Sequence, residues 1–399
     1  MNKKFRWFGK LILSFIILSP LFLFINIEDS IQNFSPKEKS PYVHWGGLDP
    51  HNEVYISWET ENPLGSYVQY GFSSDAFDFF FSNISDTLIH HAKLQGLLSD
   101  TRYYYRIVDK EGNPLSAVQT FKTAPYPGES FNITLISDTQ QAMGIGHYEV
   151  IAKALGALSD TDFVIDTGDI CQDPDDQKAW DYFFQVSSKF TSKFPLITLP
   201  GNHDGNDTKG FYTAYFTQSH PNGRYYAFNW SNVQFVMAEI ADTGDVAKNV
   251  PANDAHYAWL NQTLQNGLGQ DYRILLLHRP IFSSTANTEE LQRNLIPMIE
   301  KYNVSLVIYG HVHCYERFYY RNHTYLCIGG GGGLQNSIMR TSEYSQIQAM
   351  GPFYTQIKFS LSGVLITTFS PVGDIIDRIE FKKEGGFLIP IDSSSNGDV

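Results

Sequence analysis

Cysteine is scarce in this chain of 399 residues, which holds three: Cys171, Cys314 and Cys327. Three cysteines cannot all pair within one chain, so no disulfide framework is expected, and their number does not fix the redox compartment. A metal site made of four thiolates is excluded, because the chain has too few cysteines to build one. We therefore expect any metal ligands to be carboxylates, imidazoles and amide oxygens.

Positive charge is also limited: 29 lysines and arginines stand against 42 aspartates and glutamates, and the net charge is -13. A surface of this sign repels polyanions, so nucleic acid is not expected as a partner. A metal site can still bind phosphate locally against that field. Apolar residues are plentiful at 42%, and this content together with the chain length predicts two domains with substantial cores.

Residues 1–30 have the composition of an export signal. Four basic residues lie within the first ten, and a mostly apolar run follows from Leu11 to Ile27. No small-x-small cleavage site precedes Glu28, and the run approaches the length of a membrane span, which favours an uncleaved signal anchor over a removed signal peptide. We therefore expect an extracytoplasmic protein, either secreted or held at the membrane by this segment.

Residues 31–41 are polar and are expected to form a linker. Short runs of alternating polarity follow over residues 42–125, and their spacing predicts a small β-sandwich. The predicted strands are Val54–Glu59, Ser66–Tyr70, Thr87–Leu94, Arg102–Asp109 and Ala117–Thr123.

Residues 130–383 alternate buried strands with amphipathic helices, which predicts an α/β domain. The main predicted strands are Ile133–Ile136, Phe163–Ile165, Leu196–Leu199, Ile274–Leu277 and Leu306–Ile308. The predicted helices are Glu149–Leu158, Gln177–Phe190, Asp254–Asn266 and Glu289–Tyr302. Residues 384–399 are expected to form a disordered polar tail.

Each of these main strands is followed by polar residues suited to binding a metal. The segments are Ser137–Gln140, Gly168–Asp169, Gly201–Asp204, His278–Pro280 and Gly310–His313. Functional groups in α/β sheets collect beyond the carboxyl ends of the strands, so we expect these side chains to converge at one sheet edge. Two carboxylates, an asparagine and three histidines exceed the needs of one tetrahedral ion. They favour two ions about 3.5–4 Å apart with one bridging carboxylate, and the ligand types suit Fe, Mn or Zn.

The ordered set resembles the calcineurin-like metallophosphoesterases. The longer phrases Leu199–Asp204, His278–Pro280 and Gly310–Arg317 are similar to those of the purple acid phosphatases. Residues 42–125 resemble the fibronectin-III-like N-terminal domain of the same family. The resemblance therefore implies a fibronectin-III-like sandwich followed by two packed mixed sheets flanked by helices.

The resemblance also implies a role for each residue of the set. Metal ligands would be Asp138 and His313 on the first ion, Asn202, His278 and His311 on the second, and Asp169 on both. His203 would be a non-ligand catalytic residue near the leaving group, oriented by Asp204. Asn202, His203 and Arg279 would contact the substrate. The implied reaction is hydrolysis of a phosphate monoester by in-line attack of a metal-bound hydroxide.

The sequence departs from the purple pattern at Gln172. The purple enzymes have an iron-binding tyrosine at this position, three residues after the bridging aspartate, so this chain is expected to be colourless and to use two divalent ions. Gln140 stands where the wider superfamily often has a histidine, and we predict it as a further metal ligand.

Two alternatives remain open from the sequence. One is a phosphodiesterase or nucleotide pyrophosphatase acting at the same site, since one metal pair can serve both reactions. The other is a non-catalytic cell-surface binding protein in which the sandwich is the working part. Tyr315 and Arg317 could also contact substrate, although Glu316 and Arg317 could instead form a structural ion pair.

Overall fold

The computed structural model describes residues 39–141, 147–205, 207–217, 224–238, 255–334, 342–384 and 387–391. The predicted signal or anchor segment lies outside these residues. Among the helices that are described, none is long and apolar enough to cross a membrane. The chain divides into two compact units, Met1–Ser35 and Pro36–Val399, and only the second unit contains described residues.

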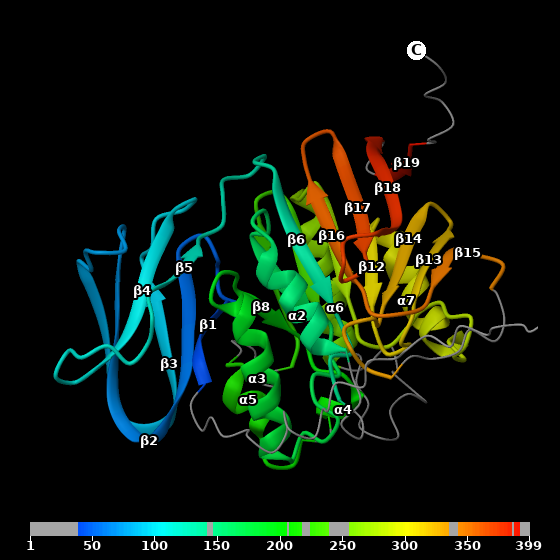
Figure 1. Ribbon diagram of the computed structural model, residues 1–399. Helices are drawn as coiled ribbons and strands as arrows, with labels where there is room; N and C mark the ends of the chain where they lie inside the picture. The colour runs from blue at the N-terminus through cyan, green and yellow to red at the C-terminus, as the bar shows by residue number, and fades with distance from the viewer. Residues whose placement is uncertain are drawn as a thin grey trace, which may run out of the picture. The chain divides into compact units, whose positions relative to one another are not determined.

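The N-terminal strands form one hydrogen-bonded sheet of five strands (Figure 1). They are β1 (Lys39–His44), β2 (Glu53–Gly71), β3 (Phe79–Gln95), β4 (Arg102–Asp109) and β5 (Gln119–Lys122).

The pairing of the long strand β2 changes along its length. Residues Glu53–Glu59 pair with the end of β3 and in part with β1, whereas Ser66–Tyr70 pair with the start of β3 and with β4. The register shifts between Glu59 and Ser66 mark this change of partners. Side chains from both halves, including Ile56 and Val68, are buried in one core. The two halves of β2 therefore join two different sets of partners within one sheet.

Two features of this domain differ from the sequence prediction. Strand β1 begins at Lys39, within the predicted linker, because Lys39 is buried and ion-paired with Glu59 and Asp181 at 2.5 and 2.7 Å. Strand β3 begins at Phe79, eight residues before the predicted Thr87. Its first part pairs with the second half of β2, and this long-range contact is not encoded in a local pattern.

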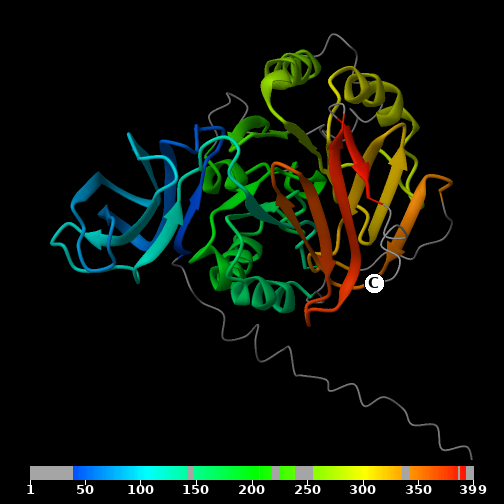
Figure 2. The same cartoon turned by 90° about the horizontal axis from the view of Figure 1, so that it is seen from above.

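The C-terminal domain contains two sheets of seven strands each (Figures 1 and 2). The first has the order β19-β18-β17-β16-β6-β7-β8, and the second has the order β15-β13-β14-β12-β11-β10-β9. The first sheet contains β6 (Phe131–Ile136), β7 (Phe163–Asp166), β8 (Leu196–Thr198), β16 (Tyr354–Phe359), β17 (Gly363–Phe369), β18 (Ile375–Glu384) and β19 (Phe387–Pro390). The second contains β9 (Tyr226–Trp230), β10 (Val233–Met237), β11 (Tyr272–Leu276), β12 (Leu306–Tyr309), β13 (Tyr315–Tyr320), β14 (His323–Ile328) and β15 (Ser345–Ala349).

Side chains point alternately to the two faces of each sheet, so that the sheets pack against each other on one face and against helices on the other. Ile133 and Leu135 of β6 share a buried cluster with Ile274 and Ile308 of the other sheet. The opposite faces pack against helices. On the first sheet these are α2 (Tyr148–Ala157), α3 (Gln177–Thr191) and α5 (Phe211–Tyr215); on the second they are α6 (Ala255–Asn266) and α7 (Glu289–Lys301). The predicted pair of packed mixed sheets flanked by helices is therefore confirmed.

The disordered tail was predicted to begin too early in the chain. Strand β18 continues to Glu384, and β19 pairs with it antiparallel from Phe387 to Pro390. Leu388 is buried by this pairing and joins the main core. Residues 392–399 lie outside the described part of the chain.

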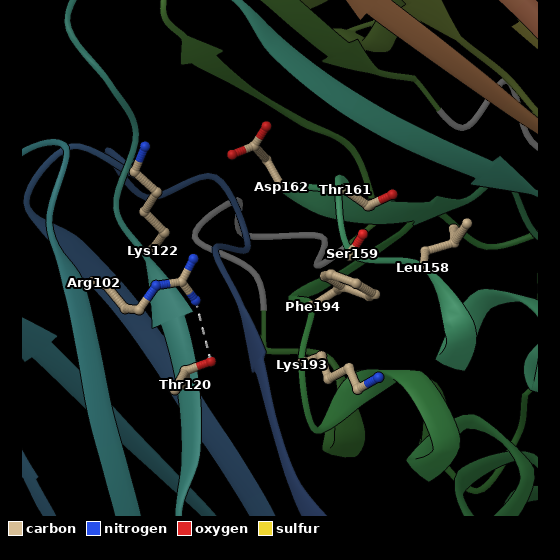
Figure 3. A pocket seen from close by; sticks show the side chains of 9 residues that line it. All are labelled: Arg102, Thr120, Lys122, Leu158, Ser159, Thr161, Asp162, Lys193 and Phe194. Atoms are coloured by element: carbon tan, nitrogen blue, oxygen red, sulfur yellow. Dashed lines mark hydrogen bonds between the residues drawn. The ribbon is translucent and has the colours of Figure 1, made fainter. Parts of the chain in front are cut away.

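A cavity of about 290 Å³ lies beside β4, β5 and the segment that precedes β7 (Figure 3). Its basic side chains have partners within the protein: Lys122 pairs with Asp100 at 2.6 Å, and Lys193 donates to the Gly156 carbonyl. Asp162, also in the lining, accepts a hydrogen bond from the Asn132 backbone at 2.9 Å. The charged side chains that line the cavity are therefore paired within the protein. The cavity lies at the amino ends of β6 and β7, whereas the predicted ligands follow the carboxyl ends of these strands.

Candidate metal centre

The predicted ligands follow strands of both sheets. Asp138, Asp169 and Asn202 come after β6, β7 and β8 of the first sheet, whereas His278 and His311 come after β11 and β12 of the second. The expectation of a single sheet edge is therefore wrong. Convergence of the ligands depends on the packing of two sheets, which the order of the residues along the chain does not reveal.

The loops that follow β6 of the first sheet and β12 of the second sheet meet at Asp138. Its buried carboxylate accepts hydrogen bonds from the His311 backbone at 3.1 and 2.9 Å and lies 3.3 Å from Nε2 of His313. Gly310 permits this approach, because a Cβ there would lie 2.4 Å from Oδ2 of Asp138. Asp138 and His311 both have left-handed backbone conformations, with φ of 60° and 68°.

Asp169 lies between two histidines and also has a left-handed backbone, with φ of 55°. Its Oδ1 accepts from the His203 backbone at 2.8 Å, and its Oδ2 lies 3.2 Å from Nε2 of His278. Burial alone would raise the pKa of Asp169, but the His278 and His203 rings outweigh burial and hold this pKa well below its usual value. The side chain therefore offers an ionised carboxylate in a buried position.

His278 is oriented by its other ring nitrogen. Nδ1 lies 2.9 Å from the Thr167 carbonyl, which can only accept, so Nδ1 carries a proton and Nε2 faces Asp169. Burial lowers the pKa of His278, but the Asp169 carboxylate outweighs this and raises the pKa to about 10. A second group that fixes the tautomer in this way is typical of metal-binding histidines.

His311 completes a compact cluster. Its ligand atom and those of Asp169 and His278 all lie within 4.8 Å of one another. Burial and the neighbouring His278 and Arg279 lower the pKa of His311 to about 3. A neutral imidazole, the form that binds metals, is therefore favoured at this position.

Gln140 and His313 lie on the Asp138 side of the cluster. The amide nitrogen of Gln140 is 3.3 Å from Oδ2 of Asp169 and 3.4 Å from Nε2 of His313. Its Oε1 is buried and has no hydrogen-bond partner among the residues that the structure describes. A buried amide oxygen without a donor is a group that a cation would satisfy. Together with the carboxylates and imidazoles, this oxygen fits a site for divalent metal ions.

Asn202 begins the short helix α4 (Asn202–Gly205), which follows the loop after β8. The residue before it, Gly201, lies against Asp169, because a Cβ at Gly201 would be 2.2 Å from Oδ1. This close approach brings the start of α4 beside the buried carboxylate. Arg279 also lies at the cluster, with Nη1 3.1 Å from Nε2 of His311.

Asp204 does not orient His203 as the sequence analysis expected. Its buried carboxylate instead accepts hydrogen bonds from the backbone of Gly201, Ile170 and Cys171 at 2.9 to 3.2 Å. The His203 ring contacts Gln172, with Nδ1 2.9 Å from its carbonyl oxygen. Sequence reasoning missed this contact, although the departure of Gln172 from the purple pattern had marked the position.

The residues that follow His313 have structural partners. Arg317 pairs with Asp377 at 2.7 Å, and the Tyr315 hydroxyl donates to the same carboxylate. Glu316 accepts from Ser284 and from Gln348. The alternative of a structural Glu316–Arg317 ion pair is therefore wrong, since each residue has another partner, and Tyr315 is buried at a junction between the sheets. All three cysteines are free and buried, as the absence of a disulfide framework predicts.

Comparison with known families gives two matches within the chain. Residues 131–315 match the family described as Calcineurin-like phosphoesterase. Residues 39–123 match the family described as Purple acid Phosphatase, N-terminal domain.

Curated relatives include purple acid phosphatases of Arabidopsis thaliana. Purple acid phosphatase 23 is 25% identical over 308 residues, which are 63% of this chain and 64% of that protein. Fe(3+)-Zn(2+) purple acid phosphatase 12 is 28% identical over 326 residues, covering 73% of this chain and 68% of that protein. The match to purple acid phosphatase 15 spans 54% of its length. The chain thus matches little more than half to two thirds of these relatives.

Solved structures share the fold. Purple acid phosphatase PPD1 from yellow lupin superposes with a TM-score of 0.72 at 18% identity, covering 85% of this chain and 74% of that one. PhoD superposes with a TM-score of 0.66 at 15% identity, covering 90% of this chain and 93% of that one. The domain arrangement therefore recurs at low sequence identity.

Proposed function

Because this chain carries a calcineurin-like phosphoesterase domain preceded by a purple acid phosphatase N-terminal domain, we propose that it is a binuclear metal-dependent phosphatase acting on phosphate monoesters. The observation that carries the proposal is the buried cluster in which Asp169, His278 and His311 present ligand atoms within 4.8 Å of one another. Asp138 and His313 lie beside this cluster, 3.3 Å from each other.

We propose that Asp138, His313 and Gln140 hold one divalent ion and that Asn202, His278 and His311 hold the other, with Asp169 bridging both. Bound ions would neutralise phosphate charge and supply a hydroxide nucleophile near neutral pH. The Thr167 and Leu334 carbonyls support this assignment, because they contact the outer ring nitrogens of His278 and His313.

His203 suits the leaving-group side of the site. Its side chain is 32% exposed, so a substrate can reach it, and its Nε2 lies 4.0 Å from Oδ2 of Asp169. A protonated ring there would donate to the departing oxygen, while Arg279 would contact the phosphoryl oxygens.

The test is to measure metal content and hydrolysis together. We expect about two ions per chain after reconstitution with Mn, Zn or Fe(II), and faster hydrolysis of p-nitrophenyl phosphate than of bis-p-nitrophenyl phosphate. A strong preference for the diester would instead support the phosphodiesterase alternative. Less than one ion per chain with no hydrolysis would support the non-catalytic binding protein.

Single substitutions test the assigned roles. Asn202→Ala and His311→Ala are expected to abolish turnover, because each removes a proposed ligand. His203→Ala is expected to lower turnover of an alkyl phosphate by about 100-fold or more, the usual effect of losing a general acid, with both ions retained. Loss of metal from the His203 variant would contradict its non-ligand role.

We further propose that the protein is exported, on the basis of the basic and apolar composition of residues 1–30. Fractionation of cells that express the full chain, followed by N-terminal sequencing, would separate a cleaved signal from a membrane anchor. Recovery of the intact chain in the cytoplasm would contradict export.

A further inference from the structure

His203 is held from two directions by the loop that follows β7. Its backbone nitrogen donates to Oδ1 of Asp169 at 2.8 Å, at the beginning of this loop. Its ring contacts Gln172, three residues later, where Nδ1 lies 2.9 Å from the carbonyl oxygen and 3.3 Å from the side-chain amide nitrogen. The loop therefore sets both the position of the residue and the direction of the ring.

The contact with the Gln172 carbonyl determines which nitrogen faces the site. A carbonyl oxygen only accepts, so Nδ1 must carry a hydrogen and Nε2 is the nitrogen that can exchange a proton with a substrate. The Gln172 amide can add a second acceptor: a half-turn of the amide group brings Oε1 to the place of Nε2, next to Nδ1. Gln172 can thus place two oxygens around the same N–H.

The loop is rigid where it carries Gln172. The backbone nitrogens of Ile170 and Cys171 both donate to the buried Asp204 carboxylate at 3.1 to 3.2 Å. Because the backbone of residues 170 and 171 is held by these hydrogen bonds, the Cα atom of Gln172 is also held in place. Among the described residues, the hydrogen-bond contacts of the Gln172 side chain and carbonyl go to His203 and not to a proposed metal ligand.

We propose that Gln172 is a positioning residue that holds the His203 ring with Nε2 directed at the leaving oxygen. This inference rests on the proposed function and assigns a role to the position at which the chain departs from the purple pattern. Poor leaving groups such as alkoxides need proton donation in the transition state, whereas p-nitrophenolate leaves with little help. Gln172 therefore matters most for alkyl phosphates.

The experiment compares Gln172→Met, which keeps the length of the side chain but removes the acceptor, with Gln172→Glu, which keeps an acceptor. Gln346→Met is the matched control, because Gln346 is exposed on β15. The metal-loaded full chain is assayed with glycerol 2-phosphate and with p-nitrophenyl phosphate. We expect Gln172→Met to lower kcat/KM about 10-fold or more for the alkyl ester and less than about 3-fold for the aryl ester. Gln172→Glu should retain the alkyl activity.

Equal losses on both esters, or loss of metal from Gln172→Met, would overturn the positioning role. A readout independent of turnover is the ¹⁵N spectrum of labelled histidine in the full chain. We expect His203 to be protonated at Nδ1 in the native protein and also in Gln172→Met, since the backbone carbonyl remains, and we expect the Nδ1–H signal to shift in Gln172→Met because the side-chain acceptor is lost; an unchanged Nδ1–H signal would also overturn the role. Failure of the native chain to hydrolyse either ester, with the Nδ1–H form intact, would instead count against the proposed function.

Discussion

His278 lies between a carbonyl and a carboxylate, with Nδ1 2.9 Å from the Thr167 oxygen and Nε2 3.2 Å from Asp169. Without a metal ion, the two side chains form an ion pair, since the carboxylate raises the pKa of His278 to about 10. A metal ion would have to displace the proton from Nε2 before it could bind there. Proton and metal therefore compete for one atom.

Metal uptake is accordingly expected to release about one proton per chain from His278 at neutral pH. Because the raised pKa keeps the ring protonated below pH 10, metal affinity should rise with pH, by up to about tenfold per unit below that value. Calorimetric titration of the metal-free protein in buffers of different ionisation enthalpy measures this release. An enthalpy that is the same in every buffer would contradict it.

Close approach at Gly201 provides a second prediction for a single residue. A Cβ there would lie 2.2 Å from Oδ1 and 2.3 Å from the backbone nitrogen of Asp169. Gly201→Ala must therefore move the carboxylate, at a cost of about 1–3 kcal/mol, and we expect loss of bound metal and of activity. Gly269→Ala is the control, since a Cβ at Gly269 meets nothing within 4 Å. Normal metal content in Gly201→Ala would refute the prediction.

At the scale of elements, Asp204 ties the loop after β7 to the start of α4. One carboxylate accepts from the backbone of Gly201 on one side and of Ile170 and Cys171 on the other. It thereby fixes the distance between the two segments that carry Asp169 and Asn202. Asp204 is therefore a structural residue of the candidate metal centre.

Asp204→Ala is expected to destabilise the fold by about 3 kcal/mol or more, because three buried N–H groups lose their acceptor and each costs about 1–3 kcal/mol. The affinity for metal ions should fall together with the stability of the fold. Asp176→Ala, which removes the exposed N-cap of α3, should cost about 1 kcal/mol with metal binding unchanged. Chemical denaturation measures the stability of both variants, and metal analysis measures their metal content. Equal effects in the two variants would argue against a structural role for Asp204 at the proposed metal site.

The sequence predicted elements well where apolar periodicity was strong. The β7 and α3 predictions fall within a residue or so of Phe163–Asp166 and Gln177–Thr191. Strand β18 was missed because charged residues lie along its exposed face. The sequence of Ile375–Glu384 therefore could not be distinguished from a polar segment. Strand β13 (Tyr315–Tyr320) was missed because its ion pair, between Arg317 and Asp377, joins residues 60 positions apart and leaves no local pattern.

The candidate metal cluster was predictable as a set of residue types, because each proposed ligand follows a buried strand. Its geometry was not, since the ligands of two different sheets meet only through the packing of Ile133, Ile274 and similar core residues. The orientation of His203 was also beyond the sequence. Its nearer contact is a backbone carbonyl, which every residue type has, and the side-chain amide of Gln172 lies at the same ring nitrogen only in the folded chain.

At the scale of the whole unit, Lys39 links the two domains that follow the N-terminal segment. Its side chain is 2% exposed and pairs with Glu59 of β2 at 2.5 Å and with Asp181 of α3 at 2.7 Å. Burial lowers the pKa of Lys39, but the two carboxylates outweigh this and raise it. The N-terminal and C-terminal domains thus share one buried charge cluster.

Lys39→Ala leaves two carboxylates facing each other without a cation, so we expect a loss of about 3–5 kcal/mol in unfolding free energy. The matched control is Lys358→Ala, which removes an exposed lysine of β16 and should change stability by less than about 0.5 kcal/mol. Thermal and denaturant unfolding measure both variants. A Tm for Lys39→Ala equal to that of the control would show that the cluster does not stabilise the domain contact.

The left-handed conformations of Asp138, Asp169 and His311 have a consequence for engineering. Each costs about 1–2 kcal/mol relative to an ordinary conformation, and glycine would remove that cost. A screen that selects this protein for heat resistance alone would therefore reward glycine wherever this relief exceeds the loss of the side chain's own hydrogen bonds, such as those that Asp138 and Asp169 accept. It would enrich variants that are harder to unfold and chemically inert, so any such selection has to be coupled to an assay of turnover.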